Sequence, residues 1–173
     1  ATSLYYISYT IVSILLIIPG SMSVSLFVEG SHDNIDSSHF LKSFTLVFLA
    51  LVFCILVILI FGKNILSIFN GGYEAAFNLL FIMSLSSIFY AICSIYFSRL
   101  KVNKKLRELI YLNLIIFSTH IFLSYIFLKQ YGLIGAGYAW IMSYLLCSMI
   151  ITLINRKHIK SFIEVLAGMK NLQ

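Results

Sequence analysis

Five long apolar stretches occupy most of this 173-residue chain. They run over residues 4–28, 44–61, 77–97, 109–128 and 133–154. A hydrocarbon core about 30 Å thick is crossed by about 20 apolar residues in a helix, and each stretch is close to this length. The sequence therefore predicts an all-α transmembrane helical bundle with five spanning helices, over residues 1–155, in which the polar side chains are the informative ones.

The composition leaves little material for a soluble domain. Hydrophobic residues make up 61% of the chain and charged residues 10%, against roughly 45–50% and about 25% in soluble proteins. The net charge is +6, but the basic residues cluster beside the ends of the apolar stretches, where anionic lipid headgroups lie. We therefore expect membrane lipids, and no nucleic acid, as partners of these charges.

Lysine and arginine are distributed unevenly between the two ends of the expected bundle. Successive connections alternate between the two sides of a membrane, and among the 12 Lys and Arg residues only Lys63 and Lys129 fall on one of these sides. Short loops rich in Lys and Arg stay in the cytoplasm. The sequence therefore predicts a multi-pass protein of the cytoplasmic membrane, with its N-terminus outside and its C-terminus inside.

Three segments outside the spans have expectations of their own. The tail, residues 156–173, has apolar side chains at 159, 162, 163 and 166, which is the spacing of a short helix lying on the cytoplasmic leaflet. The second stretch is expected to end at Gly62, before a short interfacial segment over residues 65–69. The acidic and histidine residues of loop 29–39 match no standard metal-site spacing, and we expect a solvated turn there.

Small side chains recur at helical spacing in the third and fifth stretches. The third has Ser84, Ser87, Ala91, Ser94 and Ser98 at steps of three and four, and the fifth has Gly135, Ala139, Ser143 and Cys147 at steps of four. Small residues let helix backbones approach closely in lipid. We expect these two faces to make the tight helix contacts, and Cys54, Cys93 and Cys147 to act as small hydrophobes.

Polar residues within the apolar stretches are candidates for function. His120 is an ionisable side chain deep inside a span, where it is either a hydrogen-bonded core histidine or a group coupled to a proton or substrate. Asn113 lies seven residues earlier, on a similar helix face. Trp140 either lines a cavity or packs against a neighbouring helix.

A proline interrupts the first span. Pro19 removes a backbone donor, and it marks either a packed kink or a bend that moves during transport. The freed carbonyl is expected to be satisfied by flanking serines, which are Ser13, Ser21, Ser23 and Ser25.

Motifs for chemical catalysis are absent from the sequence. There is no Gly-rich phosphate loop, no pair of carboxylates within the membrane and no recognisable nucleophile motif. We therefore expect no enzymatic activity, no catalytic residues, no cofactor and no metal site.

Several motifs are similar to those of a known family. Tyr131–Tyr138 (YGLIGAGY), followed by AWIMSYLL, resembles the lipid-linked oligosaccharide and O-antigen flippases of the MOP (multidrug/oligosaccharidyl-lipid/polysaccharide) superfamily. Tyr9 with the later Ile18-Pro19-Gly20 resembles the eighth spanning helix of that family. Ile65–Tyr73 (ILSIFNGGY) resembles the loop after the ninth, and Lys101–Arg107 the basic loop before the eleventh. The chain departs from the family pattern at Val28-Glu29, where a second proline is common.

The resemblance implies a place for this chain in a larger transporter. It corresponds to the last five of about twelve helices in a secondary transporter that flips lipid-linked oligosaccharide or polysaccharide repeat units across the membrane. Its partners would be the lipid-linked oligosaccharide and the missing N-terminal lobe, with a central cavity between the two lobes. The candidates for the cavity or transport path are Tyr9, Pro19, Asn113, His120 and Trp140.

Two other functions also fit the sequence. The chain is alternatively a membrane-embedded scaffold or partner subunit, active only by packing against other helices. It is also compatible with a component of a transferase that uses polyprenyl-linked sugars. That enzyme would need clustered acids at a membrane face, and loop 29–36 is the only candidate.

Overall fold

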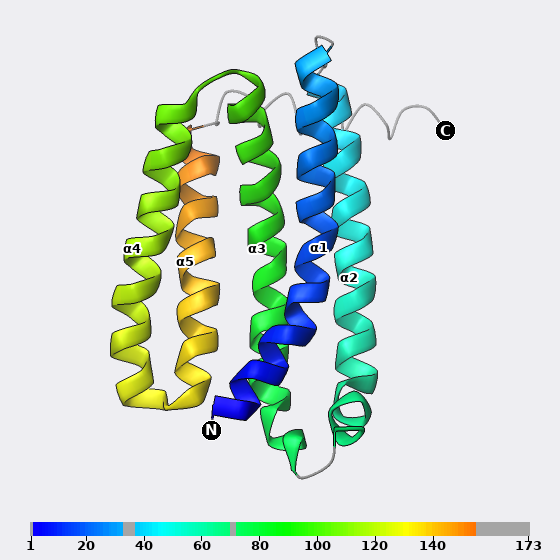
Figure 1. The fold of residues 1–173 in the computed structure, drawn as a ribbon, viewed down its shortest axis with the longest axis vertical. Coiled ribbons are helices and arrows are strands. Elements are labelled where there is room, and N and C mark those ends of the chain that lie inside the picture. Colours follow the sequence, from blue (N-terminus) through cyan, green and yellow to red (C-terminus); the bar gives the residue numbers. More distant parts are fainter. Residues whose placement is uncertain (1, 33–36, 70–71, 155–173) are drawn as a thin grey trace.

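The computed structural model describes residues 2–32, 37–69 and 72–154, and their long elements are all α-helices. These are α1 (Thr2–His32), α2 (Ser37–Ser67), α3 (Phe77–Val102), α4 (Leu106–Tyr131) and α5 (Leu133–Ile154), with a 3-10 turn, η1 (Tyr73–Ala76), before α3. Successive helices run in opposite directions along one bundle (Figure 1). All five are long enough and apolar enough to cross a membrane. The predicted five-helix bundle is confirmed, and it indicates a multi-pass membrane protein.

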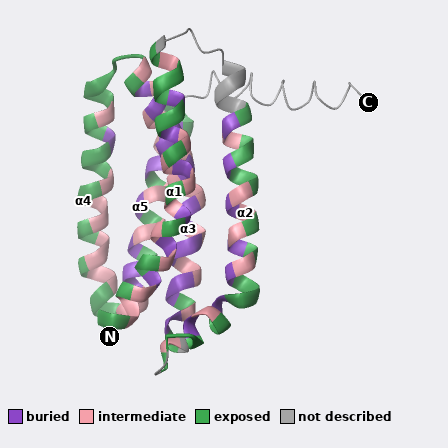
Figure 2. Cartoon of the chain, turned by 45° about the vertical axis from the view of Figure 1, so that its right-hand side comes forward, coloured by how far each residue is buried: buried purple, intermediate pink, exposed green. Residues whose placement is uncertain are grey.

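The end of α2 differs from the prediction. The helix does not stop at Gly62 but continues through Lys63 to Ser67, and Figures 1 and 2 show its last turns bent across the end of the bundle. Gly62 is needed for packing, because a Cβ at this position would lie 2.8 Å from the ring of Phe77. The interfacial segment expected at 65–69 is thus largely the last part of α2. The expected tail helix over 156–173 lies outside the described residues.

The third helix, α3, is the centre of the bundle. It packs against α1, α2 and α5, and Figure 2 shows buried residues along most of its length. The small side chains of its predicted stripe are all buried, namely Ser84, Ser87, Ala91, Ser94 and Ser98. Because these side chains are short, α1 and α5 can approach the α3 backbone closely.

Hydrogen bonds between serines join α1 to α3. The Ser23 hydroxyl donates to the Ser94 carbonyl at 2.9 Å and lies 2.7 Å from the Ser98 hydroxyl. The Ser98 hydroxyl in turn lies against the Ser23 carbonyl. Such interhelical hydrogen bonds contribute about 0.6–2 kcal/mol each in a membrane, so they add to the packing of this contact.

The proline in α1 packs against α3. Pro19 is fully buried, and its carbonyl oxygen lies 3.5 Å from the Ser94 hydroxyl, whose nearer acceptor is the Ala91 carbonyl at 3.1 Å. Ser13 and Ser21 donate to the carbonyls of Thr10 and Ile18, and Ser23 donates to α3. The expectation that flanking serines satisfy the carbonyl freed by Pro19 is therefore wrong for these three residues.

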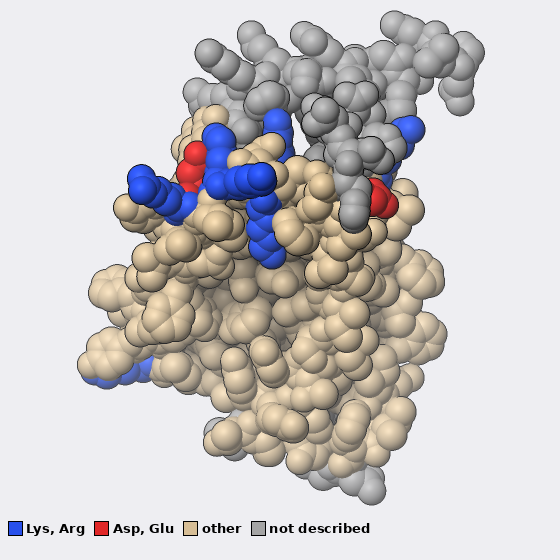
Figure 3. Space-filling model, turned by 45° about the horizontal axis from the view of Figure 1, so that its top comes forward, with Lys and Arg blue, Asp and Glu red and all other residues tan. Residues whose placement is uncertain are grey.

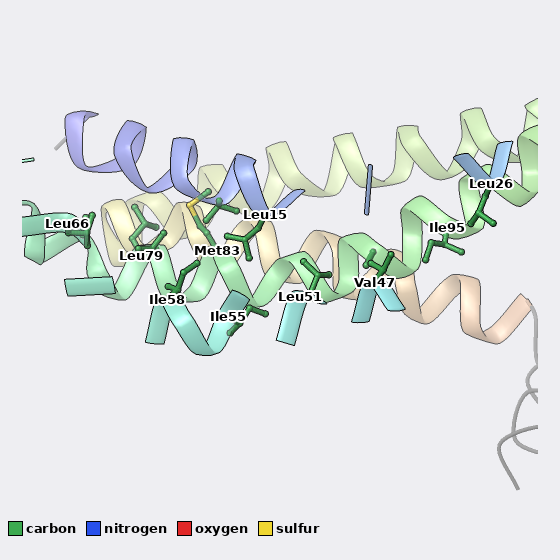
Figure 4. Close-up of a cluster of buried hydrophobic side chains, with 14 residues drawn as sticks. Leu15, Leu26, Val47, Leu51, Ile55, Ile58, Leu66, Leu79, Met83 and Ile95 are labelled. Atoms are coloured by element: carbon green, nitrogen blue, oxygen red, sulfur yellow. The ribbon is translucent and has the colours of Figure 1, made fainter. Parts of the chain in front are cut away.

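A continuous apolar core fills the space between α1, α2 and α3 (Figure 4). Leu15 and Leu26 of α1, Leu51 of α2, and Leu79 and Met83 of α3 are each at most 5% exposed. On the far side of α2, by contrast, Leu46, Phe53 and Leu59 are each at least 50% exposed. An apolar surface of this kind is what lipid contact requires.

Glycines make the turn between α4 and α5. Only Gly132 separates these helices, and its φ of +58° lies in the region that favours glycine. Three residues later, Gly135 packs directly on the backbone of α4, since a Cβ there would lie 2.1 Å from the Phe127 carbonyl oxygen. The small residues predicted on α5, namely Gly135, Ala139, Ser143 and Cys147, are all buried.

Substitution of Gly135 tests this packing. In Gly135→Ala the new methyl group meets backbone, which cannot move aside as a side chain can. We expect a loss of stability of about 1–3 kcal/mol, as for overpacked cores, seen as a lower midpoint of thermal unfolding in detergent by circular dichroism.

The matched control is Gly20→Ala, because a Cβ at Gly20 has nothing within 4 Å. Replacing a glycine inside a helix with alanine there should raise stability by about 0.5–1 kcal/mol. An unfolding midpoint of Gly135→Ala equal to that of the unsubstituted protein would contradict the close α4–α5 contact.

Candidate functional site

Trp140 is the meeting point of aromatic side chains from three helices. Its ring centroid lies 5.8 Å from that of Tyr9 in α1, 5.7 Å from that of His120 in α4 and 5.7 Å from that of Tyr144 in α5. Distances of 4.5–7 Å with tilted or edge-to-face rings are favourable, at about 0.5–1.5 kcal/mol per pair. Three of the candidate transport residues from the sequence, Tyr9, His120 and Trp140, therefore form one contact group.

Further tyrosines extend this group at both ends. Tyr5 stacks on Tyr9 with centroids 6.2 Å apart, and its hydroxyl lies beside the Trp140 indole. Tyr90 of α3 meets Tyr144 edge to face at 5.4 Å. The six side chains, which we call the Trp140 cluster, are Tyr5, Tyr9, Tyr90, His120, Trp140 and Tyr144. They come from four of the five described helices.

Trp140 and His120 lie well inside helices that are long enough to cross a membrane. Trp140 is seven residues inside the start of α5, or about 10 Å along the helix axis. His120 is 11 residues from the end of α4 at Tyr131, or about 16 Å. A histidine at this depth is costly in lipid and normally faces a bundle interior or water.

Polar atoms of the cluster reach the surface of the bundle. Tyr90 and Tyr144 are partly buried, and no hydrogen bond involves their hydroxyl groups in the part of the chain that the structure describes. No fully buried side-chain oxygen or nitrogen among those residues lacks a partner, so neither hydroxyl is completely enclosed. Tyr9 is itself 40% exposed. The cluster is thus partly buried, and Tyr9 brings it to the surface of the bundle.

A hollow lies on the face of the bundle between α4 and α1, two of the helices that carry the cluster. Figures 1 and 2 together place α1 and α4 in front of α3 and α5. Figure 3 shows that the face between α4, on the left, and α1 is hollowed. Toward one end of the bundle the N-terminal part of α1 approaches α5 (Figure 1), where Tyr9 contacts Trp140. We call this hollow the α1–α4 groove.

Lysine and arginine side chains lie at the other end of the α1–α4 groove. Five cations lie at the end of α3, in the α3–α4 turn and at the start of α4, namely Arg99, Lys101, Lys104, Lys105 and Arg107. Figure 3 shows blue side chains above the hollow. Among the described residues, Lys105 is the one of these cations with a carboxylate partner, Glu108 at 3.1 Å. The turn is fixed by hydrogen bonds from Lys104 N to Lys101 O and from Lys105 N to Leu100 O, which form a Schellman motif. The groove therefore has a basic end and an aromatic, uncharged end.

The structure does not bring two other candidates to the cluster. Asn113 is exposed on α4 and donates to the Leu109 carbonyl at 2.8 Å. Pro19 is buried against α3. Sequence reasoning in turn missed Tyr5, Tyr90 and Tyr144. A signal for two of them was present, because Tyr5 lies four residues before Tyr9 and Tyr144 four residues after Trp140, so each pair shares a helix face.

Residues suited to metal binding do not gather in the described part of the chain. No group of three His, Cys, Asp or Glu side chains is placed to hold a metal ion there. Cys93 and Cys147 are both fully buried, on α3 and α5, and the Cys93 thiol lies 3.9 Å from the Tyr144 carbonyl. Buried thiols of this kind pack as small hydrophobes.

Comparison with known proteins identifies no relative of this chain. No family model matches it, and neither the curated proteins nor the solved structures include a match.

Proposed function

We propose that the chain is the C-terminal part of a secondary transporter that flips lipid-linked oligosaccharide or polysaccharide units across the cytoplasmic membrane. The observation that supports this most is the α1–α4 groove, which presents tyrosine hydroxyls and a histidine at membrane depth. Lipid does not satisfy such groups, so they face water, a polar substrate or further protein. The resemblance of the motifs to the MOP flippases points to the same activity.

The groove suits the two chemical parts of a lipid-linked sugar. Its basic end would attract the phosphate groups that join sugar to lipid, because charge-assisted contacts from Lys and Arg favour phosphate oxygens. The hydrophobic tail would remain in the bilayer, against the apolar outer faces of α2 and α4. In this proposal the N-terminal lobe of the same transporter covers the other side of the groove, and the groove becomes half of a central cavity.

The orientation that we propose has the basic end of the bundle in the cytoplasm. Among the described residues this end has Lys42 and the five cations of the α3–α4 turn, and the opposite end has Lys63 and Lys129. The rule that Lys and Arg in short loops stay inside places the N-terminus of α1 outside.

Labelling of single cysteines tests the orientation. The three native cysteines are replaced with alanine, and Lys104→Cys and Lys129→Cys are made separately, both at exposed positions. In intact cells a membrane-impermeant thiol reagent should label Lys129→Cys and should label Lys104→Cys only after permeabilisation. Labelling of Lys104→Cys in intact cells would overturn the orientation.

A flipping assay tests the transport function. The product of the complete reading frame is reconstituted in liposomes with a fluorescent polyprenyl diphosphate oligosaccharide, and translocation is followed by quenching from outside. We expect Tyr9→Ala to lower the rate at least tenfold, because it removes the ring that joins α1 to Trp140.

Tyr6→Ala is the matched control in this assay. Tyr6 lies three residues earlier on α1, is 69% exposed and has no ring contact with the cluster. Its rate should stay within twofold of the unsubstituted transporter. Absence of translocation by the complete protein, or equal rates for the two variants, would contradict the proposal. A defined complex with an unrelated protein would then favour the scaffold function.

A further inference from the structure

We propose that the Trp140 cluster is a saccharide-binding platform, on which sugar rings stack as they pass along the α1–α4 groove. This inference rests on the proposed function and adds the position and chemistry of its sugar site. The cluster has five tyrosine or tryptophan rings and one imidazole, and it contains no Asp, Glu, Lys or Arg.

Aromatic rings and hydroxyls together match the two kinds of surface on a sugar. The face of an aromatic ring is electronegative and attracts the weakly positive C–H groups on the flat side of a pyranose. The tyrosine hydroxyls donate and accept hydrogen bonds, as do the hydroxyls of a sugar. The Tyr9 side chain is 40% exposed, and the hydroxyls of Tyr90 and Tyr144 have no hydrogen-bond partner among the described residues. An apolar aromatic surface with a few oriented polar groups is the usual composition of a small-ligand site.

The arrangement of the cluster along the groove favours a chain of sugars over a compact ligand. Contacts run from Tyr5 through Tyr9 and Trp140 to Tyr144 and Tyr90. Tyr90 lies 11 residues before Lys101 on α3, or about 16 Å from the basic turn. A ligand with a charged end at that turn and an uncharged, hydroxyl-rich body would therefore match the whole groove.

An organic cation is the main alternative ligand, because aromatic cages bind quaternary ammonium groups through cation–π contacts. The charges on this face argue against it. No carboxylate belongs to the cluster, and the groove ends at Arg99, Lys101, Lys104, Lys105 and Arg107. The chain as a whole has a net charge of +6. These cations would repel a cationic ligand and favour an anionic or neutral one.

Trp140 provides a direct readout, because it is the single tryptophan of the chain. The full chain is reconstituted in phosphatidylcholine liposomes, and its fluorescence is recorded during titration with maltotriose and, separately, with the trimer of N-acetylglucosamine. We expect a saturable change of emission with at least one trisaccharide. Tyr9→Ala and Tyr144→Ala should each raise the apparent dissociation constant at least tenfold.

Two control variants separate a loss of the site from a loss of the fold. Tyr125→Ala removes an exposed tyrosine of α4 whose ring contacts Lys129 and lies outside the cluster, and its dissociation constant should not change. Tyr144→Phe keeps the ring and removes only the hydroxyl, and it should weaken binding less than Tyr144→Ala does.

Three results would overturn the saccharide site. The first is no saturable change of emission with either trisaccharide. The second is equal binding by Tyr9→Ala and the unsubstituted chain. The third is a saturable response to tetraethylammonium in place of sugar, which would identify the cluster as a cation-binding cage. Sugar binding is measured separately from translocation. If the complete protein flips its substrate but gives no fluorescence response to sugar, the saccharide site is contradicted and the proposed function is not. If the complete protein responds to sugar but does not translocate the lipid-linked substrate, the proposed function is contradicted and the saccharide site is supported.

Discussion

The close approach of α1 and α5 to the two sides of α3 determines the shape of this bundle. In lipid no hydrophobic force draws helices together, so packing and hydrogen bonds between small residues must do so. The buried serines of α3 provide both, since Ser94 and Ser98 bond to the α1 backbone and to Ser23. Gly135 has the same role where α5 meets α4.

The candidate site follows from this packing. α1 packs on α3, α4 packs mainly on α5, and α1 and α4 do not pack against each other along their length. Figure 3 shows a hollow on the face between them. The Trp140 cluster contains tyrosine hydroxyls and His120, whereas the outer side of α2 presents leucine, isoleucine and phenylalanine. A membrane protein with one polar face and one apolar perimeter has its functional surface on the polar face.

The fold was largely predictable from the sequence. A lipid bilayer restricts a spanning chain of this composition to helices, and their length and apolar composition can be read directly from the sequence. The apolar stretch at 133–154 coincides with α5, and the others lie inside longer helices, such as 44–61 within α2. Helices continue past the last apolar residue because their backbone bonds do not depend on side-chain polarity. The site was only partly predictable. Tyr9, His120 and Trp140 were candidates singly, but their contact joins residues more than 100 positions apart, and nothing local in the sequence specifies it.

The central claim is that one face of the bundle meets water at membrane depth, and two adjacent residues of α4 test it. His120 is partly buried against Trp140, and its neighbour Ile121 is 53% exposed. In a background without native cysteines, His120→Cys and Ile121→Cys are reconstituted in liposomes and treated with a charged methanethiosulfonate reagent. The account predicts rapid modification of His120→Cys and at least tenfold slower modification of Ile121→Cys. Equal rates, or faster modification of Ile121→Cys, would contradict it.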